Sequence, residues 1–296
     1  MKIAFITNVP NSIARVRLHN EAIKKGHSLS ILSWKNIVLN SEFASKIADS
    51  LNGYDVVHFA GGLGNFATKE VQEILEGRGV FCPNSYTRRS FDADHKVFQT
   101  IRFVKAGLPI PKSVRATHLD IEHLVMELGW PIVSKEPDSS QGKGVRLLRS
   151  ADDVAQLTAR KEYLFQQYID YEADYRVHVA GGKTFCPYRR IPPSGDFRAN
   201  VSLGGRIEKV SDESVLQEIN SLGVRTAKVM DLDYCAVDLI KDKSGRFFVL
   251  ETNSDPGFKG VEEITGESFA AVILDYYESN LPSQLSSQTP PDRKVQ

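Results

Sequence analysis

Two apolar runs late in the chain decide the fold: Tyr234-Cys-Ala-Val-Asp-Leu-Ile240 and Phe247-Phe-Val-Leu-Glu-Thr-Asn253. The polar segment 241–245 between them ends in glycine, so the spacing predicts a β-hairpin with strands over 234–240 and 246–252. Because side chains alternate between the two faces of a strand, Glu251 and Asn253 point the same way, and the paired strand can bring Asp238 beside them. Carboxylate and amide oxygens are the ligands that Mg²⁺ prefers.

Taken alone, the same hairpin also fits two solvated carboxylates on the polar face of a half-buried sheet. The turn Ser254-Asp-Pro-Gly257 follows Asn253 directly and fixes the end of the second strand. A fixed strand end favours the metal site, with Asp238, Glu251 and Asn253 as ligands. Mg²⁺ is the expected ion, and Mn²⁺ is an acceptable substitute.

A second group of residues is cationic and rich in glycine: Lys96, Lys135 and the loop Ser139-Ser-Gln-Gly-Lys-Gly144. Lys135 ends a predicted strand over 131–135, and the loop leads into a second strand over 145–148. An ammonium group and several backbone N–H groups can together surround a polyphosphate. The loop lacks the GxxxxGK[ST] spacing of a P-loop, and taken alone a Gly-Lys-Gly turn also fits an ordinary hairpin.

A third group lies in the segment Gly195-Asp-Phe-Arg-Ala-Asn-Val-Ser-Leu-Gly-Gly205. Arg198 can donate two parallel hydrogen bonds to a phosphate or a carboxylate, and Asn200 lies on the same side of an extended chain. The alternative is a surface loop with an ordinary salt bridge.

The first ninety residues indicate an α/β domain. Apolar runs at 3–6, 28–32, 56–59 and 80–81 alternate with stretches at 13–25 and 71–75, which predicts βαβ units and a parallel sheet. The carboxyl ends of its strands would place segments 8–12 and 60–64 at the edge of a cleft. The glycines of 60–64 favour a tight turn over a dinucleotide site, because no acidic residue ends a strand about twenty residues further on.

From residue 91 onward the pattern is that of an α+β protein. Helices are expected over 91–106, 121–128, 152–158 and 212–230, with strands over 163–168 and from 175 onward. We therefore expect an α/β domain over 1–90, a small lobe over 91–172 and a C-terminal lobe over 173–282. Residues 283–296 are rich in Ser, Gln, Pro and charge, and a tail of this composition is expected to be disordered.

Charge and hydrophobicity exclude several classes of partner. The 296 residues include 37 Lys plus Arg and 37 Asp plus Glu, so no global positive field attracts nucleic acid or a membrane. The apolar runs are far shorter than the ~20 residues that span a bilayer, and the run at 3–6 is typical of a first strand rather than a signal peptide. Three widely spaced cysteines, Cys82, Cys186 and Cys235, are expected to be free thiols in a reducing cytoplasm.

Together these groups resemble the ATP-grasp superfamily, and most closely its RimK-like branch of amino-acid ligases. The resemblance covers about Asp92 to Gly266 and consists of six blocks in the expected order. The blocks are Asp94-His-Lys96 with Gly107-Leu-Pro-Ile-Pro111, Pro131-Ile-Val-Ser-Lys135 with Gln141-Gly-Lys-Gly144, Phe165-Gln-Gln-Tyr-Ile169, Asp174-Tyr-Arg176, Gly195-Asp-Phe-Arg-Ala-Asn200, and Val237-Asp238 with Glu251-Thr-Asn253 and Pro256-Gly257. Their ordered co-occurrence is more specific than any single block.

The resemblance implies an ATP-grasp fold preceded by a small parallel-sheet α/β domain, and it implies a role for each matching residue. Lys96 and Lys135 would contact the ATP phosphates, and the loop with Ser140, Gln141 and Gly142 would close over these phosphates. Adenine would be recognised by Gln167, Tyr168 and Ile169, and the ribose would be contacted by Asp174. The transferring phosphate would be contacted by Arg198 and Asn200, and the metal would be bound by Asp238, Glu251 and Asn253. Lys135, Arg198 and Asn200 would be the catalytic residues.

Some positions depart from the pattern of the branch. The departures are Gln167 where Glu often precedes the tyrosine, Ser134 in place of an apolar residue, and Lys143 as an added charge in the glycine loop. The sequence leaves open which arginine meets an acidic substrate, among Arg176, Arg189 and Arg190.

The implied activity is ligation of a carboxylate to an amine through an acyl-phosphate, with ATP and Mg²⁺ as cofactors and an amino acid as the amine. The carboxylate would belong to a peptide, a protein or a small molecule. Three alternatives stay open: a small-molecule ligase of the D-alanine–D-alanine ligase or glutathione synthetase type, an ATP-grasp kinase, and a non-catalytic nucleotide-binding protein. The protein would be cytoplasmic, and the sequence allows a homo-oligomer.

Overall fold

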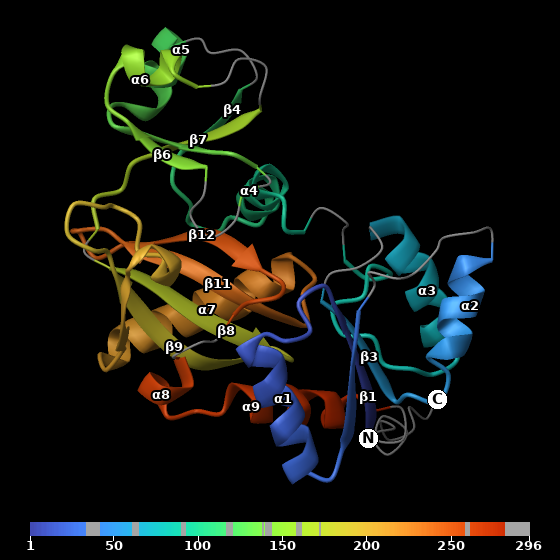
Figure 1. Cartoon of the computed structure of the whole chain (residues 1–296). Coiled ribbons are helices and arrows are strands. Elements are labelled where there is room, and N and C mark those ends of the chain that lie inside the picture. Colours follow the sequence, from blue (N-terminus) through green and yellow to red (C-terminus); the bar gives the residue numbers. More distant parts are fainter. Residues whose placement is uncertain are drawn as a thin grey trace, which may run out of the picture. The chain divides into compact units, whose positions relative to one another are not determined.

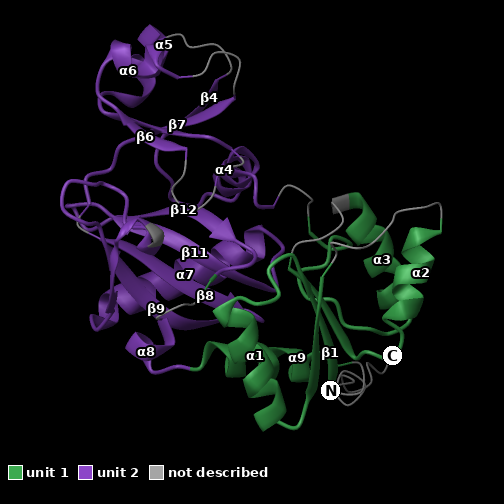
Figure 2. Ribbon diagram, in the orientation of Figure 1, with its two compact units in different colours: residues 1–91, 257–259, 268–296 green, residues 92–256, 260–267 purple. Residues whose placement is uncertain are grey.

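The computed structural model describes residues 1–33, 42–60, 65–89, 93–116, 121–137, 139, 144–157, 162–171, 173–257 and 261–281. The chain packs into two compact units, one formed by 1–91, 257–259 and 268–296 and the other by 92–256 and 260–267 (Figure 2). Three predicted features lie outside the described residues: the glycine turn at 61–64, the loop with Ser140, Gln141 and Gly142, and the tail 283–296.

Unit 1 is built on a three-stranded parallel sheet in the order β2-β1-β3 (Figure 1). Its strands are β1 (Lys2–Thr7), β2 (Ser28–Leu32) and β3 (Val56–Ala60), and its helices are α1 (Ile13–Lys24), α2 (Phe43–Ser50), α3 (Asn65–Gly77) and α9 (Phe269–Ser279). Every residue of β3 is buried, as expected of a strand that helices cover on both faces. The predicted parallel sheet is confirmed.

Helix α9 belongs to unit 1, although it comes from the far end of the chain. It packs against α1, where Lys25 Nζ lies 2.5 Å from Asp275 Oδ1. The fully buried hydroxyl of Tyr277 lies 2.5 Å from Nδ1 of His58 in β3. The expected division placed 269–279 in the C-terminal lobe, and the structure differs because these long-range contacts tie α9 to the parallel sheet.

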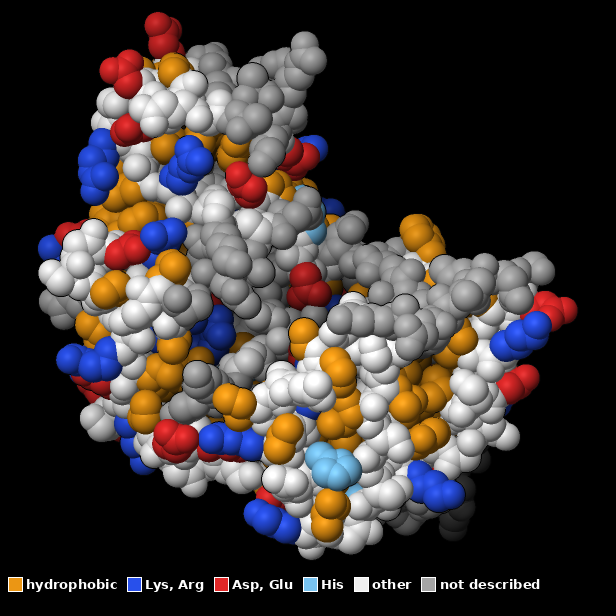
Figure 3. Space-filling model, in the orientation of Figure 1, with side chains coloured by type: hydrophobic (Ala, Val, Ile, Leu, Met, Phe, Trp, Pro, Cys, Tyr) orange, Lys and Arg blue, Asp and Glu red, His pale blue; other side chains and the backbone are white. Residues whose placement is uncertain are grey.

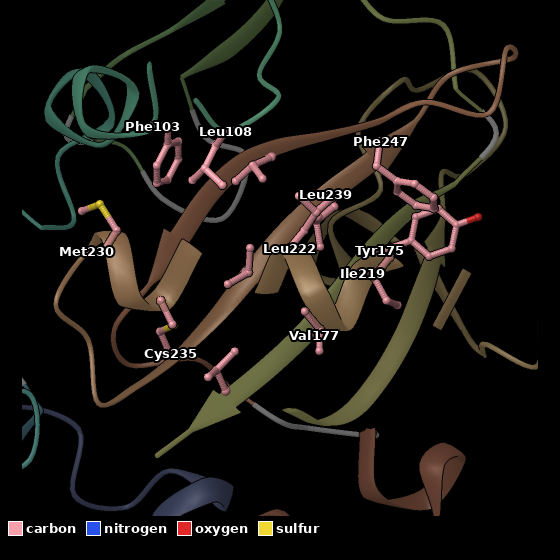
Figure 4. Close-up of a cluster of buried hydrophobic side chains, with 14 of the residues drawn as sticks. Phe103, Leu108, Tyr175, Val177, Ile219, Leu222, Met230, Cys235, Leu239 and Phe247 are labelled. Carbon is pink, nitrogen blue, oxygen red and sulfur yellow. The ribbon is translucent and has the colours of Figure 1, made fainter. Parts of the chain in front are cut away.

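The larger sheet of unit 2 is antiparallel, with five strands in the order β10-β9-β8-β11-β12. The strands are β8 (Asp174–Ala180), β9 (Lys183–Ile191), β10 (Arg206–Lys209), β11 (Tyr234–Lys241) and β12 (Phe247–Asn253). Helix α7 (Glu213–Val229) covers one face of this sheet, where Ile219 and Leu222 pack among strand side chains such as Val177 (Figure 4). The predicted hairpin is present as β11 and β12.

The smaller sheet of unit 2 is also antiparallel, with four strands in the order β4-β7-β5-β6. The strands are β4 (Ser113–Ala116), β5 (Ile132–Lys135), β6 (Val145–Leu148) and β7 (Tyr163–Gln167), and the helices beside them are α5 (Ile121–Leu128) and α6 (Ala151–Ala155). Apolar side chains of both helices and of the strands form one buried cluster. The sequence pattern does not predict β4, because four residues with no fully buried position give too short an alternation.

Helix α4 (Lys96–Lys105), helix α8 (Val261–Thr265) and the 3₁₀ turn η2 (Val201–Leu203) also belong to unit 2. The sequence pattern predicts α4 from residue 91, but the helix begins at Lys96. The reason is Asp94, whose carboxylate accepts hydrogen bonds from the backbone N–H and the hydroxyl of Ser254, at 3.2 and 2.7 Å. These bonds hold the turn before α4 against the end of β12.

The surface carries both signs of charge. On the face shown in Figure 3, Lys and Arg side chains are interspersed with Asp and Glu side chains, as their equal numbers lead one to expect. No helix among the described residues is long and apolar enough to cross a membrane. Cys82, Cys186 and Cys235 are all free and buried.

Candidate active site

An open cleft with about 800 Å³ of empty space lies within unit 2, and residues from both of its sheets line it. Its wall contains ten of the residues selected from the sequence: Lys96, Lys135, Gln167, Tyr168, Ile169, Asp174, Arg198, Asn200, Asp238 and Glu251. These residues come from helix α4, from strands and from loops that are far apart in the chain. The fold therefore gathers most of the predicted site into one place.

The β11–β12 hairpin presents the two predicted carboxylates side by side. Asp238 and Glu251 are direct cross-strand partners, and the ladder shifts at a bulge immediately after Asp238. Asn253 is exposed, pairs with Ala236 and accepts a hydrogen bond from the backbone N–H of Asp255 at 3.0 Å. It is not among the residues that line the cleft, so the structure brings together two of the three predicted metal ligands.

Two arginines hold Asp238, of which Arg190 is buried and Arg176 has 13% of its side chain exposed. Arg176 donates from Nε and Nη2 to its two carboxylate oxygens, at 2.5 and 2.6 Å, and Nη2 of Arg190 lies 3.0 Å from Oδ2. Arg190 also forms a bidentate pair with Asp174, at 2.5 and 2.7 Å. Burial acts to raise the pKa of Asp238, but the charges of both arginines outweigh it and hold that pKa well below its ordinary value. Asp238 is therefore a carboxylate at neutral pH.

The three arginines that the sequence left open occupy different places. Arg190 lines the cleft, whereas Arg176 pairs with Asp238 and is not among the lining residues. Arg189 pairs with Glu208 at 2.7 Å, and 44% of its side chain is exposed. Arg190 is thus the one of these three that is placed to meet a ligand in the cleft.

Two lysines lie close to the hairpin carboxylates. Lys135, at the end of β5, is buried, and this burial lowers its pKa although the charge of Glu251 opposes the shift. Lys96 begins α4, where its Nζ donates to the carbonyl of Ser139 and lies 4.0 Å from Oε2 of Glu251. Ammonium groups beside a carboxylate suit phosphate groups that are bridged to the protein by a divalent cation.

Another part of the cleft wall is apolar and contains residues that the sequence analysis missed: Pro111, Val133, Phe197, Ile240 and Leu250. A flat heteroaromatic base fits such a wall, because binding sites bury most of a ligand against apolar side chains. Gln166 is buried beside this wall, and its Nε2 donates to Ser113 Oγ at 2.9 Å. No local signal marks the apolar residues, since their sequence pattern is that of ordinary core positions.

Arg198 and Asn200 reach the cleft from the loop before η2. Nη2 of Arg198 forms an ion pair with Oδ2 of Asp196 at 2.7 Å, and 29% of the Arg198 side chain is exposed. The arginine thus has the local salt bridge of the second interpretation, and it also lines the cleft. A phosphate bound in the cleft could replace Asp196 as the partner of Arg198.

The family model of the RimK-like ATP-grasp domain matches residues 93–277, which is more than half of the chain. The chain belongs to the RimK-like ATP-grasp family. The predicted family and fold class are thereby confirmed, and the match contains every residue that lines the cleft.

Relatives of this RimK-like protein extend the match over both units. A probable alpha-L-glutamate ligase of Haemophilus influenzae is 30% identical over 306 residues, which cover 95% of this chain and 98% of the relative. The corresponding protein of Vibrio parahaemolyticus is 29% identical, with 95% and 96% covered. The N-terminal residues that lie outside the family model are therefore shared with full-length relatives.

Solved structures show the same fold. The ATP-grasp ligase PsnB, complexed with a minimal precursor, Mg and ADP, has a TM-score of 0.72 at 20% identity and covers 94% of this chain and 96% of its own. D-alanine–D-alanine ligase from Bacillus anthracis, complexed with ATP, has a TM-score of 0.70 at 18% identity, with 97% and 99% covered. At these identities the likeness concerns the fold. Membership of the family makes ATP the cofactor of this protein.

Proposed function

We propose that this RimK-like protein is an ATP-dependent ligase that joins a carboxylate to the amino group of an amino acid. The observation that carries the proposal is the single cleft that gathers Lys96, Lys135 and Arg198 with the paired carboxylates of Asp238 and Glu251. Such a set neutralises a triphosphate and positions it, which is most of what catalysis of phosphoryl transfer requires.

The donor set fits Mg²⁺. Asp238 and Glu251 are adjacent in register, and the two arginines keep Asp238 ionised. No three His, Cys, Asp or Glu side chains among the described residues cluster as a metal site, so phosphate oxygens would complete the coordination, as is usual for Mg²⁺. We assign Asn253 as the third protein ligand because it lies two residues from Glu251 on the same face of β12. When bound, Mg²⁺ neutralises charge on the phosphates.

The protein's own groups would act in sequence. Lys96 and Lys135 hold the β- and γ-phosphates, and the apolar wall with residues 167–169 holds the adenine. A substrate carboxylate attacks the γ-phosphorus, the bond to the β-phosphate oxygen breaks, and Arg198 stabilises the negative charge of the transferring group. The amine then attacks the acyl carbon of the acyl-phosphate and inorganic phosphate leaves, giving an amide, ADP and a proton.

We propose L-glutamate as the amino-acid substrate, in a cytoplasmic enzyme. The support for glutamate is the name of the relatives, which are probable alpha-L-glutamate ligases. An acidic amino acid also suits a cleft whose wall includes Arg190 and Arg198. The three free cysteines are consistent with a reducing compartment.

The test is ADP release from ATP and Mg²⁺ with L-glutamate and a panel of carboxylate acceptors, namely peptides, proteins and small acids, with the products weighed by mass spectrometry. We expect ADP release that depends on both substrates, and a product heavier than the acceptor by one glutamyl residue. A phosphorylated product without an amide would indicate an ATP-grasp kinase. Nucleotide binding without turnover over the whole panel would contradict catalysis.

Paired variants show whether the cleft is responsible for the activity. Lys135→Ala removes the buried ammonium, so kcat/KM should fall by roughly 10²- to 10³-fold, the usual effect of losing one preorganised donor. Lys183→Ala removes an exposed lysine of β9 outside the cleft and should leave the rate unchanged. Equal rates in both variants would place the active site elsewhere.

A further inference from the structure

Two segments of the cleft wall contact each other in a way that the proposed function does not use. The first, residues 168–171, joins β7 to β8, and the second, residues 195–200, precedes η2. The hydroxyl of Tyr171 donates a hydrogen bond to the backbone carbonyl of Phe197. The rings of Tyr168 and Phe197 meet edge to face, with centroids 6.4 Å apart and planes at 73°.

The carbonyl of Phe197 belongs to the same planar peptide group as the N–H of Arg198. That N–H donates to Oδ1 of Asp196 at 2.9 Å, so the peptide is held from both of its polar atoms. The rest of the loop is closely packed, because Ala199 is buried and its backbone lies against Gly205. A Cβ added at Gly205 would lie only 2.2 Å from the carbonyl oxygen of Ala199. The backbone position of Arg198 is therefore set by contacts that include Tyr171.

We infer that Tyr171, in the segment that follows β7, is a positioning residue. Its hydroxyl fixes the peptide group between residues 197 and 198 and thereby orients Arg198 toward the cleft. This inference rests on the proposed function, which assigns Arg198 to the transferring phosphate. It gives the linker between β7 and β8 a second role, because residues 168 and 169 line the part of the cleft that the proposed function assigns to adenine, while Tyr171 holds the loop of Arg198.

The chemistry of the contact suits a fixed support. Burial raises the pKa of Tyr171 well above its ordinary value, and the nearby carboxylate of Asp174 adds to the shift. The hydroxyl is therefore protonated and a donor at neutral pH. Small displacements matter at such a site, because an error of about 1 Å in a positioned group can lower a rate by about 10²-fold.

The test is Tyr171→Phe, which keeps the ring and removes only the hydroxyl. Backbone hydrogen–deuterium exchange should become faster in segment 195–205, where the N–H groups of Leu203 and Gly205 both donate to the carbonyl of Asn200. In steady-state ADP release, kcat should fall by roughly 10- to 100-fold with little change in KM for ATP, because Arg198, which Tyr171 positions, acts in the transition state. In an Arg198→Ala background the same substitution should change kcat by less than about threefold, since both act through one arginine.

Tyr163→Phe serves as the matched control, because Tyr163 is a buried tyrosine of the smaller sheet outside the cleft wall. It should leave exchange in 195–205 and kcat unchanged. The inference is overturned if Tyr171→Phe leaves the exchange of 195–205 at the wild-type rate, or if it lowers kcat equally with and without Arg198. Absence of ADP release from the wild-type protein would instead contradict the proposed function, and the exchange measurement would still decide whether Tyr171 holds the loop.

Discussion

At the scale of single residues, the cleft is a set of buried charges that balance one another. Asp238 is ionised because two arginines surround it, whereas Lys135 is partly destabilised in its charged form because it is buried. Each group is therefore adjusted by residues that are distant in the sequence. Two predictions follow the two directions of these pKa shifts.

The pH dependence of catalysis should report Lys135. Burial lowers its pKa below the ordinary 10.5, so the ammonium is lost at a lower pH than that of a free lysine. Because only the charged form attracts phosphate, kcat/KM for ATP should fall as the pH rises toward 10.5. Lys135→Arg keeps its charge throughout this window, so whatever activity it retains should lack the decline. A wild-type profile that stays flat up to pH 10.5 would contradict the lowered pKa.

Arg176→Ala should destabilise the protein strongly. Breaking a buried ion pair leaves the other charge poorly compensated and costs about 3–5 kcal/mol. Arg189→Ala, on the neighbouring strand, removes an exposed pair with Glu208 and should cost less than about 1 kcal/mol. Urea unfolding at neutral pH measures both. Equal effects of the two substitutions would show that the burial of the Arg176 pair does not matter.

The lowered pKa of Asp238 means that the stability from its ion pairs is present above pH 3.8 and is lost as the pH falls below that value.

At the scale of elements, the site depends on how closely α7 packs on the larger sheet. The helix packs on one face of the sheet through apolar side chains such as Ile219 and Leu222 (Figure 4). This packing fixes the strands that carry Asp174, Arg190 and Asp238, which line the cleft. Gly223 in α7 faces Val177 of β8 at a point where a larger residue has no room: an added Cβ would lie 2.7 Å from Val177 Cγ1. This glycine is thus required by the close approach of helix and strand.

Gly223→Ala should therefore destabilise the chain even though alanine favours a helix. The gain in helix propensity is about 1 kcal/mol, whereas overpacking a core costs typically ~1–3 kcal/mol, so overpacking should prevail. Gly77→Ala, at the end of α3, meets no atom within 4 Å and should be neutral or stabilising. Thermal unfolding of the two variants decides between these expectations. A rise in melting temperature for Gly223→Ala would show that the helix can move away from β8.

At the scale of the whole molecule, the chain folds as two units whose boundaries do not follow sequence order. Unit 1 is completed by α9, and the family model that begins at residue 93 extends into that helix, as far as residue 277. The buried side chains of α9 include Phe269, Ile273 and Tyr277, so the parallel sheet depends on residues about 200 positions downstream of its own strands.

Removal of α9 should show this dependence. A chain that ends at residue 267 should lose protection against hydrogen exchange in β1 and β3, while β8 and β11 of unit 2 keep theirs. A chain that ends at residue 281 retains α9 and should match the full-length protein. The experiment would contradict the division into units if the first truncation left β1 and β3 protected, or if it exposed β11 equally.

Sequence alone determined much of the fold, and ten of the residues selected from it line the cleft. Strands β2 and β6 and helix α5 begin and end where the pattern predicts, because each is set by the spacing of its own apolar residues. The hairpin with Asp238 and Glu251 is likewise local, since the short connection 242–246 and its glycine turn fix its register. The resemblance to RimK-like proteins rested on such local blocks, and the comparisons confirm it.

Only the tertiary structure decided what surrounds those residues. The pairing of Asp238 with Arg176 and Arg190, the contact of Tyr171 with Phe197 and the place of α9 all join segments that local patterns treat as independent. The physical reason is that alternation and helical spacing report which side of an element is buried, but not which distant element covers it. The partners of a buried charge are fixed when the sheets and helices pack, and those partners set its pKa and its direction in the cleft.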